Sequence, residues 1–266
     1  MPSIDVGGVR MAYSDRGAGP VLLLVHGFPL DHTMWDGVAR RLEDRCRVIS
    51  PDLRGYGASS LGDVDADGGV PMHRYADDLA GLLDALRIDG PVVYAGFSMG
   101  GYIGWQFFRR RRDRVRALAA IDTRAAADDE QTRNMRLHVA RHVMEWGAER
   151  VAEAMLPKLF SADALRDRAD LVERTVAVIS GADPRAIAAA QIGMAARPDM
   201  RGLLPTIDVP AAVIVGEDDA ISTPAEMRAM ADAMPNARYT EVAGAGHMAP
   251  VEEPAAVAEA LAALVL

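Results

Sequence analysis

The chain has one cysteine, few aromatic residues and no long apolar segment. Cys46 is the only cysteine among 266 residues, which excludes an internal disulfide and a thiolate metal cluster and fits a reducing compartment. Its apolar runs fall far short of the roughly 20 residues that a membrane-spanning helix needs. The first residues lack the basic and apolar segments of a signal peptide. We therefore expect a cytoplasmic protein with no membrane partner.

Positive charge is also in short supply. The 29 lysines and arginines are outnumbered by 38 aspartates and glutamates, so the net charge is −9 at pH 7. Such a surface repels phosphate backbones, and we expect no nucleic-acid partner. Apolar residues make up 50% of the chain, which is enough for a sizeable core.

Short apolar runs alternate with segments of helical spacing along most of the chain. Gly7 and Gly8 separate two alternating stretches, 4–6 and 10–13, which predict a hairpin. Strands buried on both faces are expected at 21–25 and 47–50. Further strands are expected at 91–95, 115–121, 210–215 and 237–242, and helices at 77–86, 99–108, 224–234 and 254–264. This order predicts an α/β protein with a doubly wound, mostly parallel sheet.

The alternation stops between residues 123 and 200. This segment is rich in Ala, Arg, Glu and Met and has helical character almost throughout. Because predicted strands resume after residue 200, this segment is predicted to be an insertion between two strands of one sheet. We expect residues 1–122 and 201–266 to form the core and residues 123–200 a separate helical segment.

The pentapeptide Gly96-Phe97-Ser98-Met99-Gly100 lies between a predicted strand and a predicted helix. A turn this tight strains the backbone at Ser98 and needs small neighbours, which Gly96, Gly100 and Gly101 provide. The serine side chain would project from the carboxyl end of the sheet, beside a helix N-terminus that favours negative charge. This context predicts that Ser98 is a nucleophile.

The sequence resembles the α/β-hydrolase family over nearly its whole length. Beyond the pentapeptide, the resemblance is carried by His26-Gly27-Phe28-Pro29, by Asp52-Leu53-Arg54-Gly55-Tyr56-Gly57-Ala58-Ser59, and by Gly246-His247 with Pro250, Glu253 and Pro254 behind it. The resemblance implies an α/β-hydrolase fold in which the helical insertion caps the active site.

A serine hydroxyl needs a base, and the base needs an orienting acid. His247 is the expected base because it follows the small-residue loop Ala243-Gly244-Ala245-Gly246. His26 lies in the segment that resembles the oxyanion loop of the family, His26-Gly27-Phe28-Pro29, and is expected to be structural. An acid after the strand 210–215 gives the chain order expected of the fold, and the family spacing selects Asp219. Asp122, after an earlier strand, is the alternative acid.

The resemblance also implies an oxyanion hole made by the backbone amides of Phe28 and Met99. Ser98 would attack an acyl carbon while His247 takes its proton, and water would then cleave the acyl-enzyme. No metal ion and no organic cofactor is required for this chemistry.

The substrate is less well determined by the sequence than the reaction. We expect a carboxylesterase acting on small to medium esters, with a lactonase of the 3-oxoadipate enol-lactonase type as the alternative. A non-catalytic ligand receptor on the same fold is an alternative of another class. The sequence leaves the oligomeric state open, a homo-oligomer included.

Some apolar side chains of the helical insertion should line the pocket roof. Candidates are Met135, Leu137, Val139, Met144, Trp146, Met155, Leu156, Leu159 and Phe160. Such a roof suits an apolar acyl or alcohol group. Arg124 and Arg133 are the candidates for binding a substrate carboxylate.

Overall fold

An eight-stranded sheet organises the chain in the computed structural model, which describes residues 1–265. The strands are β1 (Ser3–Val6), β2 (Val9–Arg16), β3 (Val21–Val25), β4 (Arg47–Pro51), β5 (Val92–Phe97), β6 (Val115–Ile121), β7 (Ala211–Gly216) and β8 (Ala237–Val242). Their order is β1-β2-β4-β3-β5-β6-β7-β8. The pairings β1–β2 and β2–β4 are antiparallel, and the five pairings from β4 to β8 are parallel. The predicted hairpin and mostly parallel sheet are confirmed.

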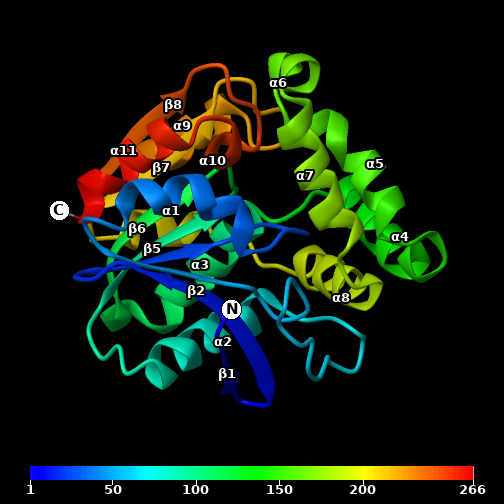
Figure 1. Ribbon diagram of the computed structural model, residues 1–266, viewed down its shortest axis with the longest axis horizontal. Coiled ribbons are helices and arrows are strands. Elements are labelled where there is room, and N and C mark those ends of the chain that lie inside the picture. Colours follow the sequence, from blue (N-terminus) through cyan, green and yellow to red (C-terminus); the bar gives the residue numbers. More distant parts are fainter. Residues whose placement is uncertain (266) are drawn as a thin grey trace.

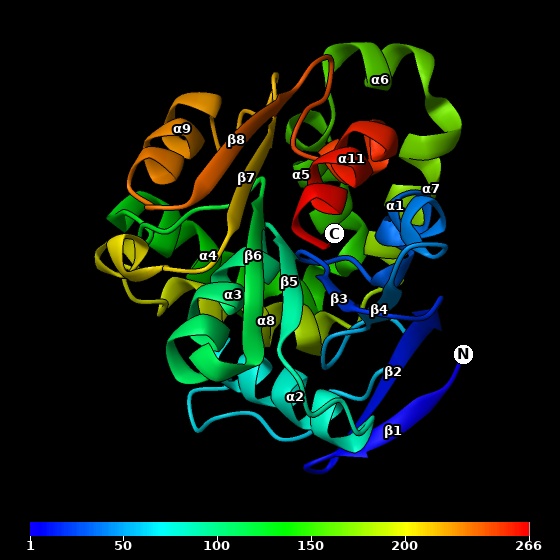
Figure 2. The ribbon, with the colours of Figure 1, turned by 90° about the vertical axis from the view of Figure 1, so that its left-hand side faces the viewer.

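Helices cover both faces of the sheet, as Figure 2 shows. Leu22 and Leu24 of β3 pack in one apolar cluster with α1 (Asp36–Leu42) and α11 (Pro254–Val265). Leu23 and Val25 point to the opposite cluster, which includes α2 (Met72–Ala85), α3 (Met99–Arg110) and α9 (Pro224–Asp232). Since successive strand residues point to opposite faces, an unbroken apolar run is what a strand between two helical layers requires.

The structure differs from the sequence expectation at three helical segments. Helix α2 begins at Met72, five residues before the predicted start, because Met72, Tyr75 and Ala76 continue its buried stripe. The 3₁₀ helix η1 (His32–Trp35) with α1, and the short α10 (Ala249–Glu252), were not expected. Both lie in loops at the carboxyl edge of the sheet and shape the site described below.

Five helices lie between β6 and β7 and are grouped at one end of the molecule in Figure 1. They are α4 (Glu130–Trp146), α5 (Ala148–Leu159), α6 (Ala162–Asp167), α7 (Ala169–Ser180) and α8 (Pro184–Ala195), and the 3₁₀ helix η3 (Arg201–Thr206) follows them. The helical insertion is where the sequence placed it, while its status as a separate domain stays a prediction. Among the described residues, every helix is too short or too polar to cross a lipid bilayer.

A buried ion-pair network joins the two linkers of this insertion. Asp128, with a side chain 2% exposed, lies 2.7 Å from Arg136 Nε and 2.7 Å from Arg197 Nη1. The guanidinium of Arg197 also lies 4.2 Å from the ring centre of Tyr102 on α3. The entering and leaving linkers are thereby held together on the core.

Replacing Asp128 by Ala is expected to destabilise the protein by about 3–5 kcal/mol, because two arginines, one of them fully buried, lose their counter-charge. Chemical denaturation followed by circular dichroism measures this loss. The matched control is Asp163→Ala, which removes an exposed partner of Arg166 and should leave the stability nearly unchanged. Equal losses in the two variants would contradict the account.

Candidate active site

Ser98 occupies the tight turn between β5 and α3. Its backbone angles are φ 50° and ψ −112°, a left-handed conformation that costs energy for a residue with a side chain. Two hydrogen bonds hold it in place: its N–H donates to Ile121 O at 2.9 Å, and Thr123 Oγ1 donates to Ser98 O at 2.7 Å. The end of β6 therefore supports the strained turn.

Glycines surround this turn because other residues would collide with the backbone. A Cβ on Gly96 would meet the carbonyl of Gly100, and one on Gly100 would meet the carbonyl of Val25. A Cβ on Gly101 would collide with the side chain of Thr123. These contacts account for the small residues that the sequence places around Ser98.

A chain of hydrogen bonds links Ser98, His247 and Asp219. His247 Nε2 lies 3.1 Å from Ser98 Oγ, and His247 Nδ1 lies 2.9 Å from Asp219 Oδ2. Since an ionised carboxylate only accepts, Nδ1 donates to Asp219 and Nε2 is left to accept the serine proton. The backbone N–H groups of Ile221 and Ser222 donate to Asp219 Oδ1 at 2.7 and 3.0 Å, which fixes the carboxylate.

Asp122, the alternative acid, has no hydrogen bond to His247 among the described residues. It is fully buried at the end of β6, and its Oδ1 accepts the N–H of Gly216 at 2.8 Å. Burial, with a contribution from Asp219, raises the pKa of Asp122 well above its usual range. Of the two aspartates, Asp219 is therefore the one that is hydrogen-bonded to His247.

Phe28 and Met99 are both buried: Met99 directly follows Ser98, and Phe28 follows Gly27, on which a Cβ would meet the side chains of Phe97 and Ser98. Residues 1–265 provide no hydrogen-bond acceptor for the N–H of Phe28. Met99 is the first residue of α3, where helix N–H groups have no partner within the helix. Both donors are therefore free to bind an oxygen that gains negative charge.

His26 is a structural histidine at the base of the Phe28 loop. Its Nε2 accepts the N–H of Leu53 at 2.9 Å, and its Nδ1 donates to Gly27 O at 2.8 Å. Burial lowers the pKa of His26, so the ring stays neutral. The ring joins the Phe28 loop to the loop that follows β4.

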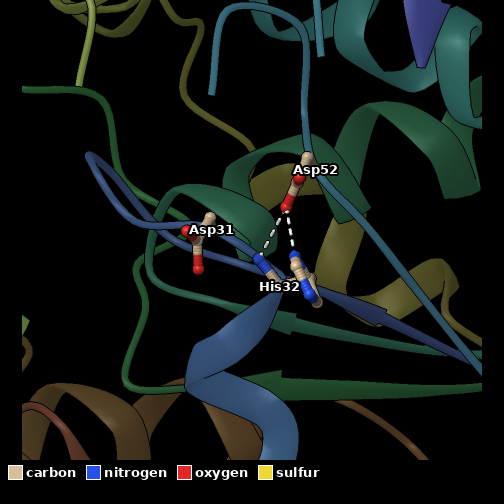
Figure 3. Close-up of side chains that lie close together, drawn as sticks. All are labelled: Asp31, His32 and Asp52. Atoms are coloured by element: carbon tan, nitrogen blue, oxygen red, sulfur yellow. Dashed lines mark hydrogen bonds and ion pairs between the residues drawn. The ribbon is translucent and has the colours of Figure 1, made fainter. Parts of the chain in front are cut away.

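A second link joins the same two loops. Asp52 Oδ1 accepts the backbone N–H of His32 at 2.9 Å and its ring Nδ1 at 2.7 Å, as Figure 3 shows, and Oδ2 accepts the N–H of Ala58. Asp31, His32 and Asp52 each have one possible metal-ligand atom, and these three atoms lie close enough to bind one cation. Both oxygens of Asp52 are already hydrogen-bonded, and one oxygen of Asp31 accepts the N–H of Thr33. These hydrogen bonds hold the two loops together.

The helical insertion contacts the histidine loop through residues that the sequence analysis missed. Glu252 Oε1 accepts the N–H of Gly246 at 2.9 Å, and its Oε2 accepts the N–H of Ser161 at 3.0 Å. Met248 N also donates to Leu159 O at 2.9 Å. The position of Glu252, just behind the histidine loop, was the available sequence signal.

Several residues expected near the substrate lie elsewhere. Met135 and Met144 are 54% and 60% exposed, so neither lines the pocket roof. Arg124 is paired with Glu226 at 3.0 Å, and Arg133 is exposed on α4. Neither arginine is set to bind a substrate carboxylate in this structure.

The link between His32 and Asp52 makes the stability depend on pH. Burial opposes a charge on His32, but the hydrogen bond and charge of Asp52 outweigh it and raise the pKa of His32 above 6.5. Burial likewise opposes ionisation of Asp52, but its hydrogen bonds lower the pKa of that carboxyl below 3.8. The pair therefore contributes most between about pH 4 and 6.5 and weakens as the pH rises through the raised pKa of His32.

The substitution His32→Asn, which keeps a neutral donor, should cost about 1 kcal/mol near pH 5.5 and less near pH 8.5. Thermal unfolding at the two pH values measures the difference. His73→Asn, at an exposed histidine on α2, is the control and should show no such dependence. A loss of the same size at both pH values would contradict a charged pair.

Comparison with known proteins agrees with this architecture. The chain is similar to a thermophilic esterase from Thermogutta terrifontis, solved in a malate-bound form, with 39% identity, a TM-score of 0.96 and full coverage of both chains. It is also similar to an enol-lactonase from Burkholderia xenovorans, with 28% identity, a TM-score of 0.90 and 99% coverage of both chains.

A curated relative, the 2-(acetamidomethylene)succinate hydrolase of Mesorhizobium japonicum, is 26% identical over 249 residues, which span 92% of this chain and 87% of that protein. The model of the alpha/beta hydrolase fold matches residues 20–254. With the parallel sheet, the strained serine turn and the relatives all in agreement, the chain belongs to the α/β-hydrolase family and is a hydrolase of that fold.

Proposed function

We propose that the protein is a serine hydrolase that cleaves small to medium carboxylic esters through an acyl-enzyme on Ser98. The observation that carries the proposal is the hydrogen-bond chain from Ser98 Oγ through His247 to Asp219. Nucleophile, base and acid are within hydrogen-bond distance, which is the geometry that activates a serine hydroxyl. The free amides of Phe28 and Met99 add the donors that an oxyanion needs.

The reaction takes place in two stages. Ser98 Oγ attacks the ester carbonyl carbon while its proton passes to His247 Nε2, and the carbonyl oxygen becomes an anion held by the amides of Phe28 and Met99. When the intermediate collapses, the imidazolium gives its proton to the leaving alcohol, and the acyl group remains on Ser98. Water, deprotonated by His247, then attacks the acyl-enzyme and releases the acid.

Ionised Asp219 stabilises the imidazolium that His247 becomes in both stages. It accepts the Nδ1 proton throughout and keeps the ring in the tautomer that leaves Nε2 free. Three N–H groups donate to this carboxylate, whose side chain is fully buried, and they fix its position beside His247.

The helical insertion is proposed to cap the substrate pocket, with residues 123–200 acting as the cap and the rest as the core. Leu159 and Phe160, both buried, are among the cap residues that lie next to the histidine loop. Since Arg124 is already paired with Glu226, uncharged acyl groups are favoured over the dicarboxylates named for two of the relatives.

A lactonase is the second candidate, because the enol-lactonase of Burkholderia xenovorans matches this chain over 99% of its length. The same groups would open a cyclic ester, in which the alcohol stays attached to the acyl chain. Comparing kcat/KM for p-nitrophenyl esters and for lactones of matched size distinguishes the two. A carboxylesterase should have the higher kcat/KM for the open-chain ester. A higher kcat/KM for the lactone would make lactonase the first candidate.

The wild-type protein should hydrolyse p-nitrophenyl acetate and butyrate, and Ser98→Ala should lower kcat at least about a thousandfold, because the nucleophile is lost. Release of p-nitrophenol measures the rate. Ser3→Ala, at an exposed serine in β1, is the matched control and should leave kcat unchanged. Undiminished turnover by Ser98→Ala, or no turnover by wild type on esters and lactones, contradicts the proposal.

The substitution Asp219→Asn should also lower kcat by about a thousandfold or more while KM changes little, since the wrong tautomer of His247 becomes favoured. Steady-state kinetics with p-nitrophenyl butyrate measure both constants. An effect on KM alone would contradict the role given to Asp219.

A further inference from the structure

A second buried carboxyl group lies behind the hydrogen-bond chain of the active site. Asp122 ends β6 in a left-handed conformation, with φ 44°, and is 0% exposed. Its backbone N–H donates to Ile214 O at 2.9 Å, and its Oδ1 accepts the N–H of Gly216 at 2.8 Å. The residue is therefore held tightly between β6 and β7, close to the loop that carries Asp219.

The other oxygen of Asp122 has no ordinary donor. Within residues 1–265, no N–H or O–H group donates to the buried Oδ2 atom. Asp219 is its neighbour: Gly216, which donates its N–H to Asp122 Oδ1, accepts the backbone N–H of Asp219 at 3.1 Å, and the side chains of the two aspartates interact. Two ionised carboxylates both accept and cannot bond to each other, so this contact requires a proton on one of them.

The surroundings of the two carboxyl groups decide which one carries the proton. Asp219 accepts N–H groups from Ile221, Ser222 and His247, all of which stabilise a negative charge. Asp122 accepts the single N–H of Gly216. The charge is therefore placed on Asp219 and the proton on Asp122.

We propose that Asp122 is a positioning residue whose protonated carboxyl donates a hydrogen bond to Asp219 and so holds the Asp219 carboxylate against His247 Nδ1. The effect of Asp122 on turnover rests on the proposed function. The proton between Asp122 and Asp219 is a property of the folded protein and does not depend on that function. A fourth hydrogen bond on Asp219 limits rotation of its carboxylate.

The electrostatics around Asp122 agree with this assignment. The titratable groups that face it are Asp219, Glu252 and, through Asp219, His247. Burial and the negative charges of Asp219 and Glu252 oppose its ionisation and raise its pKa. The carboxyl therefore stays neutral in the range in which ordinary aspartates are ionised.

The substitution Asp122→Asn tests the hydrogen bond because an amide reproduces it. The amide N–H₂ can donate to Asp219 while the amide oxygen accepts from Gly216, and Asn tolerates the left-handed backbone. We expect kcat and KM for p-nitrophenyl butyrate to stay within about threefold of wild type. Asp122→Ala, which removes the donor, should lower kcat at least about tenfold with KM nearly unchanged.

The same variant has a readout that does not need activity. Above about pH 4 the folded wild type keeps a proton that the unfolded chain releases, so its stability falls as the pH rises. Asp122→Asn lacks this cost. In denaturant unfolding, the midpoint of Asp122→Asn minus that of wild type should therefore increase steadily from about pH 4.5 to pH 7.5.

The matched control is Asp128→Asn, at a buried aspartate that is ion-paired with Arg136 and Arg197. It should lower the midpoint at neutral pH. A constant midpoint difference between Asp122→Asn and wild type, or a loss of kcat in Asp122→Asn as large as that in Asp122→Ala, would overturn the proposal. If Asp122→Ala does not fold, Asp122→Asn decides alone, and an inactive wild type would refute the proposed function without affecting the stability test.

Discussion

The hydrogen bond between His247 Nδ1 and Asp219 Oδ2 is the interaction on which the rest of the site depends. It joins the loop after β8 to the loop after β7, and so brings the base to a fixed place above Ser98. Backbone hydrogen bonds from Glu217 to Val242 and from Asp218 to Ala245 hold the two loops together. Parallel strands place all their carboxyl ends at one edge, and residues far apart in the chain can meet there.

Burial at this edge has electrostatic consequences. Asp122, Asp219 and Glu252 are all buried, and the structure satisfies their oxygens mainly with backbone N–H groups. A preorganised set of N–H groups costs little rearrangement when charge moves during a reaction. The same design appears at Asp52, whose oxygens hold the loops around Phe28. The chain thus uses carboxylates as anchors for its loops as well as for the proposed chemistry.

Much of this fold could be predicted from local sequence. Apolar runs such as Val21–Val25 predicted the strands because a strand buried on both faces has no polar positions to spare. The pentapeptide around Ser98 predicted the strained turn because its glycines have no other local explanation. The residues then expected to act together, Ser98, His247 and Asp219, do lie within hydrogen-bond distance.

Other features depend on contacts that the sequence does not reveal. Asp122 and Gly216, whose hydrogen bond anchors the second carboxyl, are 94 positions apart, and Glu252 reaches Ser161 across 91 positions. The exposure of Met135 and Met144 depends on how α4 packs against its neighbours, and helical spacing alone does not fix that orientation. Helix α2 begins five residues before the predicted start because tertiary packing buries its first turn, and no side-chain cap marks that start in the sequence.

The covalent intermediate is the most direct test of the account. The protein would be mixed with p-nitrophenyl butyrate, quenched with acid before the steady state, and digested for peptide mass spectrometry. The account predicts a butyryl group on the peptide that contains Ser98, at the Ser98 side chain. Turnover of the ester with the butyryl group on another residue, or with no acyl adduct at any quench time, would contradict it.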